Sequence, residues 1–171
     1  QTYTPDIWIA GTGPNNRGAI RISTTNMTLT GRIMLMADAM MSTQDSGGTP
    51  MTGYLSAGIG EVTPGSTFTK SGSGELFIRG ASNYTGQTVV SPVGATDTGG
   101  TLILDFANSS TVQNLLYNGV SANMLRLAGN SAGSISALTV SGKDGANNSQ
   151  TFAGVEVTNL AQIVATSGNG G

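Results

Sequence analysis

Carboxylates are the side chains of this chain that could carry chemistry, because it contains neither His nor Cys. His is the commonest general base and metal ligand, and Cys supplies thiolate ligands and disulfides. Hydrolysis of a polysaccharide needs two or three carboxylates, or carboxylates with Lys or Arg, on one face. The nine acidic residues are scattered, and we interpret the candidate pair Asp97 and Asp105 as surface or turn residues. The sequence therefore predicts no catalytic site.

Metal binding is also disfavoured by the residue types present. The segments TDTGG and GKDGANN lack the dense acidic ligands of a calcium loop. Four methionines lie close together, Met34, Met36, Met40 and Met41, and thioethers can bind soft metals. No Cys or His accompanies them, so we interpret them as side chains that fill irregular gaps in the core. We expect no metal and no cofactor.

The elements that would position any site follow one another at short, even intervals. Between Phe68 and Leu104, apolar runs centred on Phe77, Val90 and Ile103 alternate with glycine-rich turns. Phe77 to Val90 is thirteen residues, and Val90 to Ile103 is another thirteen. Regular strand and turn spacing of this kind indicates an all-β sandwich, barrel or coil. We interpret the stretch as one coil of a β-solenoid.

The same stretch resembles the autotransporter-associated β-strand repeat of secreted bacterial passenger proteins. The matching positions are Lys70, Gly72, Gly74, Leu76, Ile78, Asn83, Tyr84, Thr85, Gly86, Val89 and Val90. The departures are Arg79, Gln87 and a longer turn, SPVGATDTGG, and the segments on either side resemble the flanks of such repeats more loosely. The resemblance implies a right-handed parallel β-helix on the outside of a Gram-negative-type cell, and it implies no particular ligand.

Composition supports one β domain over residues 1–171. Charged residues make up 9% of the chain, against about a quarter in ordinary globular domains. The 26 glycines would break most helices, and the 37% of hydrophobic residues argues against a disordered chain. A net charge of −2 provides no basic face for nucleic acid. No apolar run approaches the roughly 20 residues of a membrane-spanning helix.

Stacked coils would bury what a single coil leaves exposed, because the same positions of successive coils lie about 4.8 Å apart. The predicted buried columns contain Leu76, Ile78, Val89, Leu102, Leu104, Leu125, Leu127, Leu138 and Val140. Gly86 is expected at a corner with positive φ, where a β-branched residue is strongly disfavoured. Val112, Leu115 and Leu116 have the spacing of a helical turn, so a short helix or an outward loop is expected there.

The ends of the coil are where function is expected. Residues 1–10 form a short apolar strand that could add to the edge of a neighbour, with Tyr3, Ile7, Trp8 and Ile9 as its assembly residues. We interpret Trp8 as a plug over the first coil rather than a sugar-stacking platform, and residues 167–171 as a linker or chain end. We see no capping helix at either end.

Three functions then rank in order. The first is a structural module of an extracellular or cell-surface protein, joined end to end to copies of itself or to covalent neighbouring repeats. The second is an adhesin or glycan-binding passenger module. A β-helix enzyme that degrades polysaccharide is a distant third.

Overall fold

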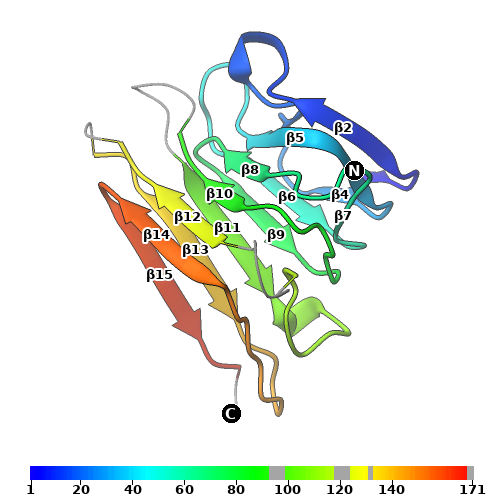
Figure 1. Cartoon of the computed structure of the whole chain (residues 1–171), viewed down its shortest axis with the longest axis vertical. Helices are drawn as coiled ribbons and strands as arrows, with labels where there is room; N and C mark the ends of the chain where they lie inside the picture. Colours follow the sequence, from blue (N-terminus) through cyan, green and yellow to red (C-terminus); the bar gives the residue numbers. More distant parts are fainter. Residues whose placement is uncertain (93–98, 118–123, 131–132, 169–171) are drawn as a thin grey trace.

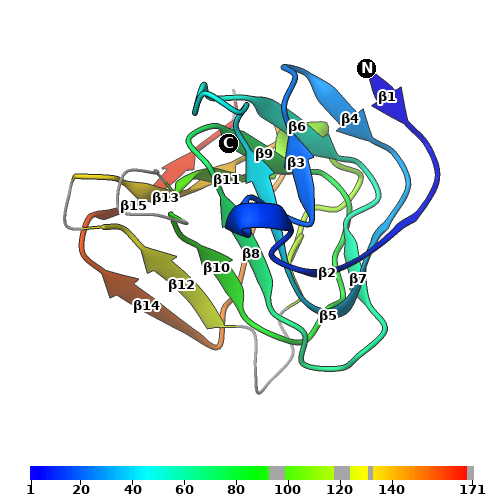
Figure 2. The same ribbon diagram turned by 90° about the horizontal axis from the view of Figure 1, so that it is seen from above.

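The chain winds into a parallel β-solenoid of about six turns (Figures 1 and 2). The computed structural model describes residues 1–92, 99–117, 124–130 and 133–168. About 48% of the structure is strand and it contains no α-helix, which confirms the predicted fold class. The N-terminus and the C-terminus lie at opposite ends of the molecule in Figure 1. The right-handed sense of the coil stays a prediction.

Two parallel sheets form the wall of the coil. Sheet A contains, in spatial order, β1 (Thr2–Tyr3), β4 (Met27–Leu29), β6 (Thr52–Leu55), β9 (Glu75–Ile78), β11 (Gly100–Asp105), β13 (Ser136–Ser141) and β15 (Ala161–Thr166). Sheet B contains β14 (Gly154–Thr158), β12 (Met124–Ala128), β10 (Thr88–Val90), β8 (Phe68–Ser71), β5 (Ile33–Thr43) and β2 (Ile7–Gly11), with β3 (Ile20–Ile22) and β7 (Ile59–Glu61) also paired to β5. Each turn of the chain adds one strand to sheet A, and to sheet B it adds either one strand or two short ones, as with β2 and β3 or β7 and β8.

Register between neighbouring strands produces continuous apolar columns. In sheet A, Leu29, Leu55, Ile78 and Leu104 are successive partners, and all four side chains are buried. Phe77 pairs with Ile103, so one turn here spans 26 residues. Burial of an aliphatic side chain contributes about 1.5–3 kcal/mol, and stacking makes that burial possible at every level.

Eight of the nine predicted column residues are buried, and Val140 is only partly buried against the core. Val89 is 9% exposed, but it does not occupy an inward position of its strand. Thr88 and Val90 pair with Leu125 and Leu127 and are fully buried, so they form the inward positions of β10. Val89 lies between them and pairs with Arg126. Since side chains alternate along a strand, Val89 faces the other side of sheet B.

The methionine prediction holds for one residue of the four. Met41 is fully buried, whereas Met34 and Met40 are partly exposed and Met36 is exposed. Alternation along β5 explains the result, because Ile33, Leu35 and Ala39 fill the inward positions and leave these methionines outside. Most of the cluster therefore lies on the outer surface.

No helical turn forms at Val112, Leu115 and Leu116. Within the described residues, helical structure is limited to the 3₁₀ turns η1 (Pro14–Asn16) and η2 (Phe106–Asn108). Leu115 and Leu116 are both fully buried in extended or irregular backbone, and the carbonyl of Leu115 accepts a hydrogen bond from Ser82 N. Both expectations, a short helix and an outward loop, are therefore wrong for Leu115 and Leu116, which are buried, whereas Val112 is 40% exposed.

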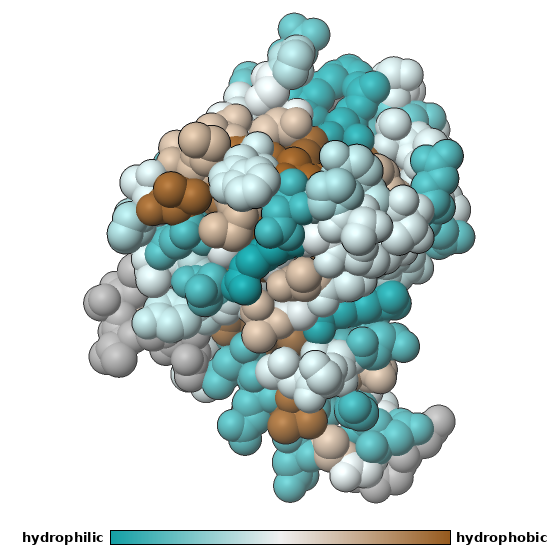
Figure 3. Space-filling view, turned by 90° about the vertical axis from the view of Figure 1, so that its right-hand side faces the viewer, coloured by the Kyte–Doolittle hydropathy of each residue, from teal (hydrophilic) through white to brown (hydrophobic). Residues whose placement is uncertain are grey.

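The exterior is largely polar and uncharged, as the composition predicts. On the side of the molecule in Figure 3, hydrophilic and intermediate residues cover most of the surface and apolar residues form separate patches. Asn side chains also occupy tight corners, where Asn26 and Asn159 adopt a φ of 58°. Such residues suit left-handed backbone because their short polar side chains tolerate it.

Gly86 is constrained by space and not by φ, which corrects the expectation. Its φ is not positive, whereas Gly72 in the same repeat has a φ of 82°. A Cβ on Gly86 would lie 2.2 Å from the carbonyl oxygen of Ser66 and 2.4 Å from that of Gly65. Gly86 therefore lets two neighbouring coils approach closely at this corner.

Replacement of Gly86 by alanine should destabilise the protein by about 1–3 kcal/mol, because the methyl group forces the two coils apart. Gly47→Ala is the matched control, since its Cβ would meet Asp45 Oδ1 at an ordinary 3.4 Å. Urea unfolding measures both. Equal midpoints for Gly86→Ala and the wild type would show that the corner has room for a side chain.

Candidate functional site at the ends of the coil

A buried lysine lies at the centre of the repeat motif. Lys70 is fully buried in the inward column of sheet B, where its register partners are Met41 and Val90. Its ammonium donates to the carbonyl oxygens of Gly72 at 2.6 Å, Gly74 at 2.6 Å and Gly99 at 2.8 Å. Three acceptors match the three N–H bonds of an ammonium group. Lys70 thereby ties two turns of neighbouring rungs together.

Burial lowers the pKa of the Lys70 ammonium well below its ordinary value of 10.5, and the charge of Glu75 opposes that shift. Gly100 leaves the space that the ammonium needs, because a Cβ there would lie 2.3 Å from Nζ. Gly74 leaves space for the backbone of the preceding rung, because a Cβ there would lie 2.0 Å from the carbonyl oxygen of Met51. Lys70 and its glycines form one interdependent unit of the coil interior.

The other motif residues also make structural contacts. Asn83 Oδ1 accepts from Arg32 at 2.7 Å across the intervening rung of Ile59, and Thr85 donates to Glu61 of the neighbouring rung at 2.7 Å. Tyr84 is fully buried, with its ring packed edge-on against Phe68 at 6.1 Å and its hydroxyl hydrogen-bonded to Thr88. Leu76 and Ile78 are buried in sheet A. The motif residues therefore stabilise the coil through buried packing and through hydrogen bonds between rungs.

The predicted assembly residues divide between two faces of the first coil. Ile7 and Ile9 pair with Ile33 and Leu35 and point inward, whereas Trp8 pairs with Met34 and is 59% exposed. Trp8 therefore lies on the outer surface, and the prediction that it plugs the first coil is wrong. Tyr3 is the register partner of buried Leu29 and is 47% exposed, so it lies open at the N-terminal end.

The core beneath the N-terminal end is closed. Ile9, Ile22 and Leu29 belong to the first rungs, yet all three are buried. Ile22 reaches across toward sheet A, where a Cβ on Gly53 would lie 2.1 Å from its Cδ1. The loop that carries η1 lies at the same end of the molecule in Figures 1 and 2. Side chains of the first coils thus cover their own core.

The C-terminal end of the coil is open, in contrast. Val155, Val157 and Ile163 are 49%, 53% and 54% exposed, and Leu160 beside them is 51% exposed. Their partners in the preceding rung, Leu125, Leu127 and Leu138, are buried to 1% exposure or less. The last rung occupies the same inward columns, and no other described residues form a rung over it. This apolar surface is called the C-terminal end surface below.

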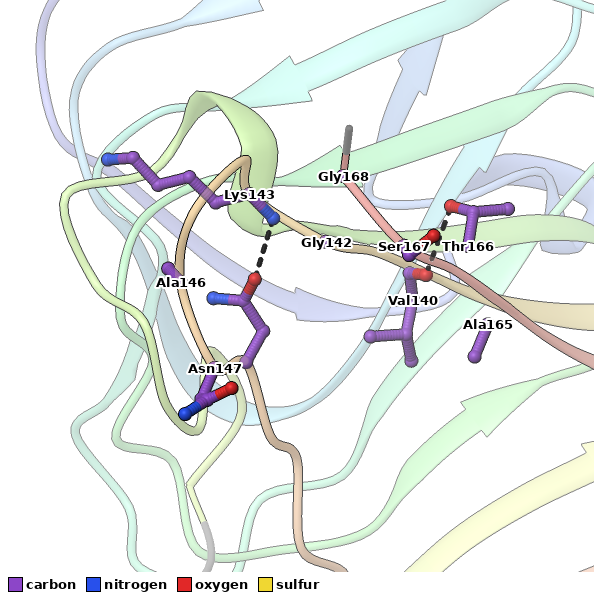
Figure 4. Close-up of a pocket in the computed structure, with 10 residues that line it drawn as sticks. Val140, Gly142, Lys143, Ala146, Asn147, Ala165, Thr166, Ser167 and Gly168 are labelled. Atoms are coloured by element: carbon purple, nitrogen blue, oxygen red, sulfur yellow. Dashed lines mark hydrogen bonds between the residues drawn. The ribbon is translucent and has the colours of Figure 1, made fainter. Parts of the chain in front are cut away.

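A hollow of about 350 Å³ opens beside the C-terminal end surface (Figure 4). Val140 and Ala165 provide apolar lining, and the loop around Asn147 provides a polar rim. Lys143 also lines the hollow, but its side chain extends away from Val140 and Ala165 in Figure 4, and its Nζ donates to Ser109 O at 3.0 Å. The hollow therefore offers space for another chain, and the Lys143 ammonium beside it already has a hydrogen-bond partner in Ser109 O.

Acidic residues do not converge in the described ranges. Asp97 lies outside the described residues, so the structure leaves the pair with Asp105 unexamined. Asp105 is buried beside Arg79 and is not the surface or turn residue that we expected. No group of three or more acidic residues capable of holding a metal ion occurs in the described part of the chain. None of the described residues form a helix long and apolar enough to cross a membrane.

No protein-family model, no curated protein and no solved structure matches this chain. The resemblance to the autotransporter-associated repeat therefore stays a prediction. The sequence located the strands of the last rung and predicted an open apolar core at both ends of the coil. The C-terminal end agrees with that prediction, whereas the core at the N-terminal end is covered. The burial of Lys70 was also not predicted from the sequence, because lysine side chains are nearly always exposed.

Replacement of Lys70 by methionine should destabilise the protein by about 2–4 kcal/mol, because buried carbonyl groups lose their donor. Lys143→Met is the matched control, since its Nζ has one carbonyl partner and should cost about 1 kcal/mol or less. Urea unfolding separates the two. A Lys70→Met protein as stable as the wild type would contradict the role assigned to the ammonium.

Lys70 should also make stability depend on pH. Between its lowered pKa and 10.5, the unfolded chain holds a proton that the folded chain releases, so stability rises with pH in that window. The slope approaches about 1.4 kcal/mol per pH unit for one proton. Urea midpoints of the wild type should rise relative to those of Lys70→Met as the pH increases toward 10.5. Parallel pH profiles for the two proteins would refute this assignment.

Proposed function

We propose that this chain is a structural module of an extracellular or cell-surface protein, and that it stacks end to end. The C-terminal end surface carries the proposal, because three inward positions of the last rung are about half exposed while the same columns are buried one rung earlier. Exposed sheet edges and open solenoid cores promote association unless they are capped. A further rung of β-coil is the occupant with the matching shape.

A second copy of the chain can supply that rung. Extension of the sheet A register beyond β15 places Thr2 of the next copy after Val164 and Tyr3 after Ala165. The large Tyr3 ring then stacks on the small Ala165 in the inward column, and both side chains become buried in the contact. Because this contact joins unlike ends, it propagates into a filament unless it closes into a ring. Covalent neighbouring repeats would use the same contact within one chain.

A location outside the cell fits the chemistry of the chain. It has no cysteine to oxidise, and its surface relies on uncharged polar side chains. The resemblance of Lys70 to Val90 to the autotransporter-associated repeat points the same way. A role as an enzyme has no support from the described carboxylates, which are dispersed or, like Asp105, held in an ion pair.

Lysine at two positions of the C-terminal end surface should abolish self-association. In Val157→Lys with Ile163→Lys, each new charge would have to be buried without a partner when a rung stacks on it. We expect concentrated wild-type protein to form oligomers or filaments in sedimentation and electron microscopy, and the double variant to stay monomeric at the same concentration. Val62→Lys is the matched control, because Val62 is 55% exposed and lies on the third turn, far from the last rung.

Tyr3→Lys distinguishes the two ways in which copies could meet. Head-to-tail stacking requires the N-terminal end as well, so this variant should also stay monomeric. A Tyr3→Lys protein that still forms dimers through its C-terminal end surface would indicate two-fold, tail-to-tail pairing. A wild-type protein that is monomeric at millimolar concentration would overturn self-stacking altogether.

A further inference from the structure

The outer face of sheet A carries an arginine stacked over the first of two adjacent aromatic rings. Tyr54 and Phe77 are register partners on neighbouring rungs, with ring centroids 4.9 Å apart. The guanidinium carbon of Arg79 lies 4.1 Å from the centroid of Tyr54 and 5.7 Å from that of Phe77. Both rings alternate along their strands with buried leucine and isoleucine, so they point away from the core. This group is called the Arg79 cluster below.

Neighbouring groups hold the guanidinium in one position. Arg79 Nε donates to Asp105 Oδ2 at 2.7 Å, and the Asp105 side chain is only 3% exposed. Asn108 Nδ2 donates to both carboxylate oxygens of Asp105 at 3.1 and 3.0 Å from the turn η2. A side chain stacked on a ring and fixed by a buried carboxylate loses little freedom when a ligand binds.

The terminal nitrogens of Arg79 are available to a ligand. They have no hydrogen-bond acceptor within the described part of the chain, and the side chain is 27% exposed. Arg32 differs, since its Nη2 donates to Ile59 O, Ala81 O and Asn83 Oδ1 and joins coils together. The paired terminal N–H groups of a guanidinium match the two oxygens of a carboxylate. The arrangement therefore offers a carboxylate a prepared partner.

A polar hollow continues the same outer face. Its volume is about 400 Å³, and Thr101, Ala137 and Gln162 line it as register partners on three successive rungs. Thr101 lies two residues before Ile103, which is the partner of Phe77, so the hollow flanks the column that contains the aromatic rings. Hydroxyl and amide groups of this kind exchange hydrogen bonds with the hydroxyl groups of a sugar.

We propose that the Arg79 cluster and the adjoining hollow bind an acidic saccharide. The terminal nitrogens of Arg79 hold the carboxylate of a uronic acid, and the exposed part of the Phe77 ring packs against the apolar face of a sugar ring. Thr101 and Gln162 bind hydroxyl groups of a neighbouring sugar. A saccharide fits better than an acidic peptide, because the Arg79 guanidinium is joined by aromatic and uncharged polar groups.

Isothermal titration with three probes tests this site, namely tetragalacturonate, the neutral maltotetraose and a tetraglutamate peptide. Tetragalacturonate should bind with a dissociation constant of about 1 mM or tighter, and the other two at least about tenfold more weakly. Binding should weaken as salt is raised, because the exposed charge pair is screened. Equal binding of maltotetraose or of tetraglutamate, or no binding of tetragalacturonate at about 10 mM, would overturn the proposal.

Two variants test where the saccharide binds, and neither leaves a buried charge without its partner. Arg79→Met with Asp105→Asn removes both partners of the ion pair and should weaken tetragalacturonate binding at least about tenfold. Phe77→Leu keeps an apolar side chain and should weaken it about fivefold. Arg126→Met is the control, since Arg126 pairs with Glu156 in sheet B. Unchanged binding in the first two variants, or an equal loss in the control, would place the saccharide elsewhere.

Discussion

Parallel register between successive rungs is the constraint on which this structure depends. Each residue of a strand lies on its counterpart one turn earlier, so a position that points inward does so in every rung. This repetition lets short strands of three to six residues bury complete side chains, as in the column from Leu29 to Leu104. It also explains the glycines, because corners such as Gly86 must let two backbones approach.

Lys70 is the exception that this register must accommodate. An ammonium in an apolar column would be costly without partners, and three carbonyl oxygens from two turns surround it. The hydrogen bonds from Lys70 fix the positions of these carbonyl groups in the turns. A buried cation thus serves the same structural purpose here that hydrogen-bonded water serves in many cores.

The sequence predicted the repeated elements well and their surroundings less well. Strand positions followed from spacing, because glycine and apolar runs report local conformation directly. The stretch from Phe68 to Leu104, expected to be one coil, contains strands of two successive rungs in each sheet. The outward position of Val89 and the exposure of Trp8 and Met36 depend on a one-residue phase that short strands barely specify. The Arg79 cluster was not predicted, because its members belong to different turns of the coil. Only the register brings Tyr54, Phe77 and Asp105 together.

The unequal ends give the molecule a direction. The core is closed beneath the N-terminal end and open at the other, so any assembly built from this contact is polar and extends by adding an N-terminal end to an exposed apolar rung. The two tips of such an assembly then differ: one presents an exposed apolar rung and the other a covered N-terminal end. A single copy whose last rung is blocked joins through its intact N-terminal end and stops further addition at that tip. Array length could therefore be controlled by a small fraction of blocked copies, far below the amount of the subunit itself.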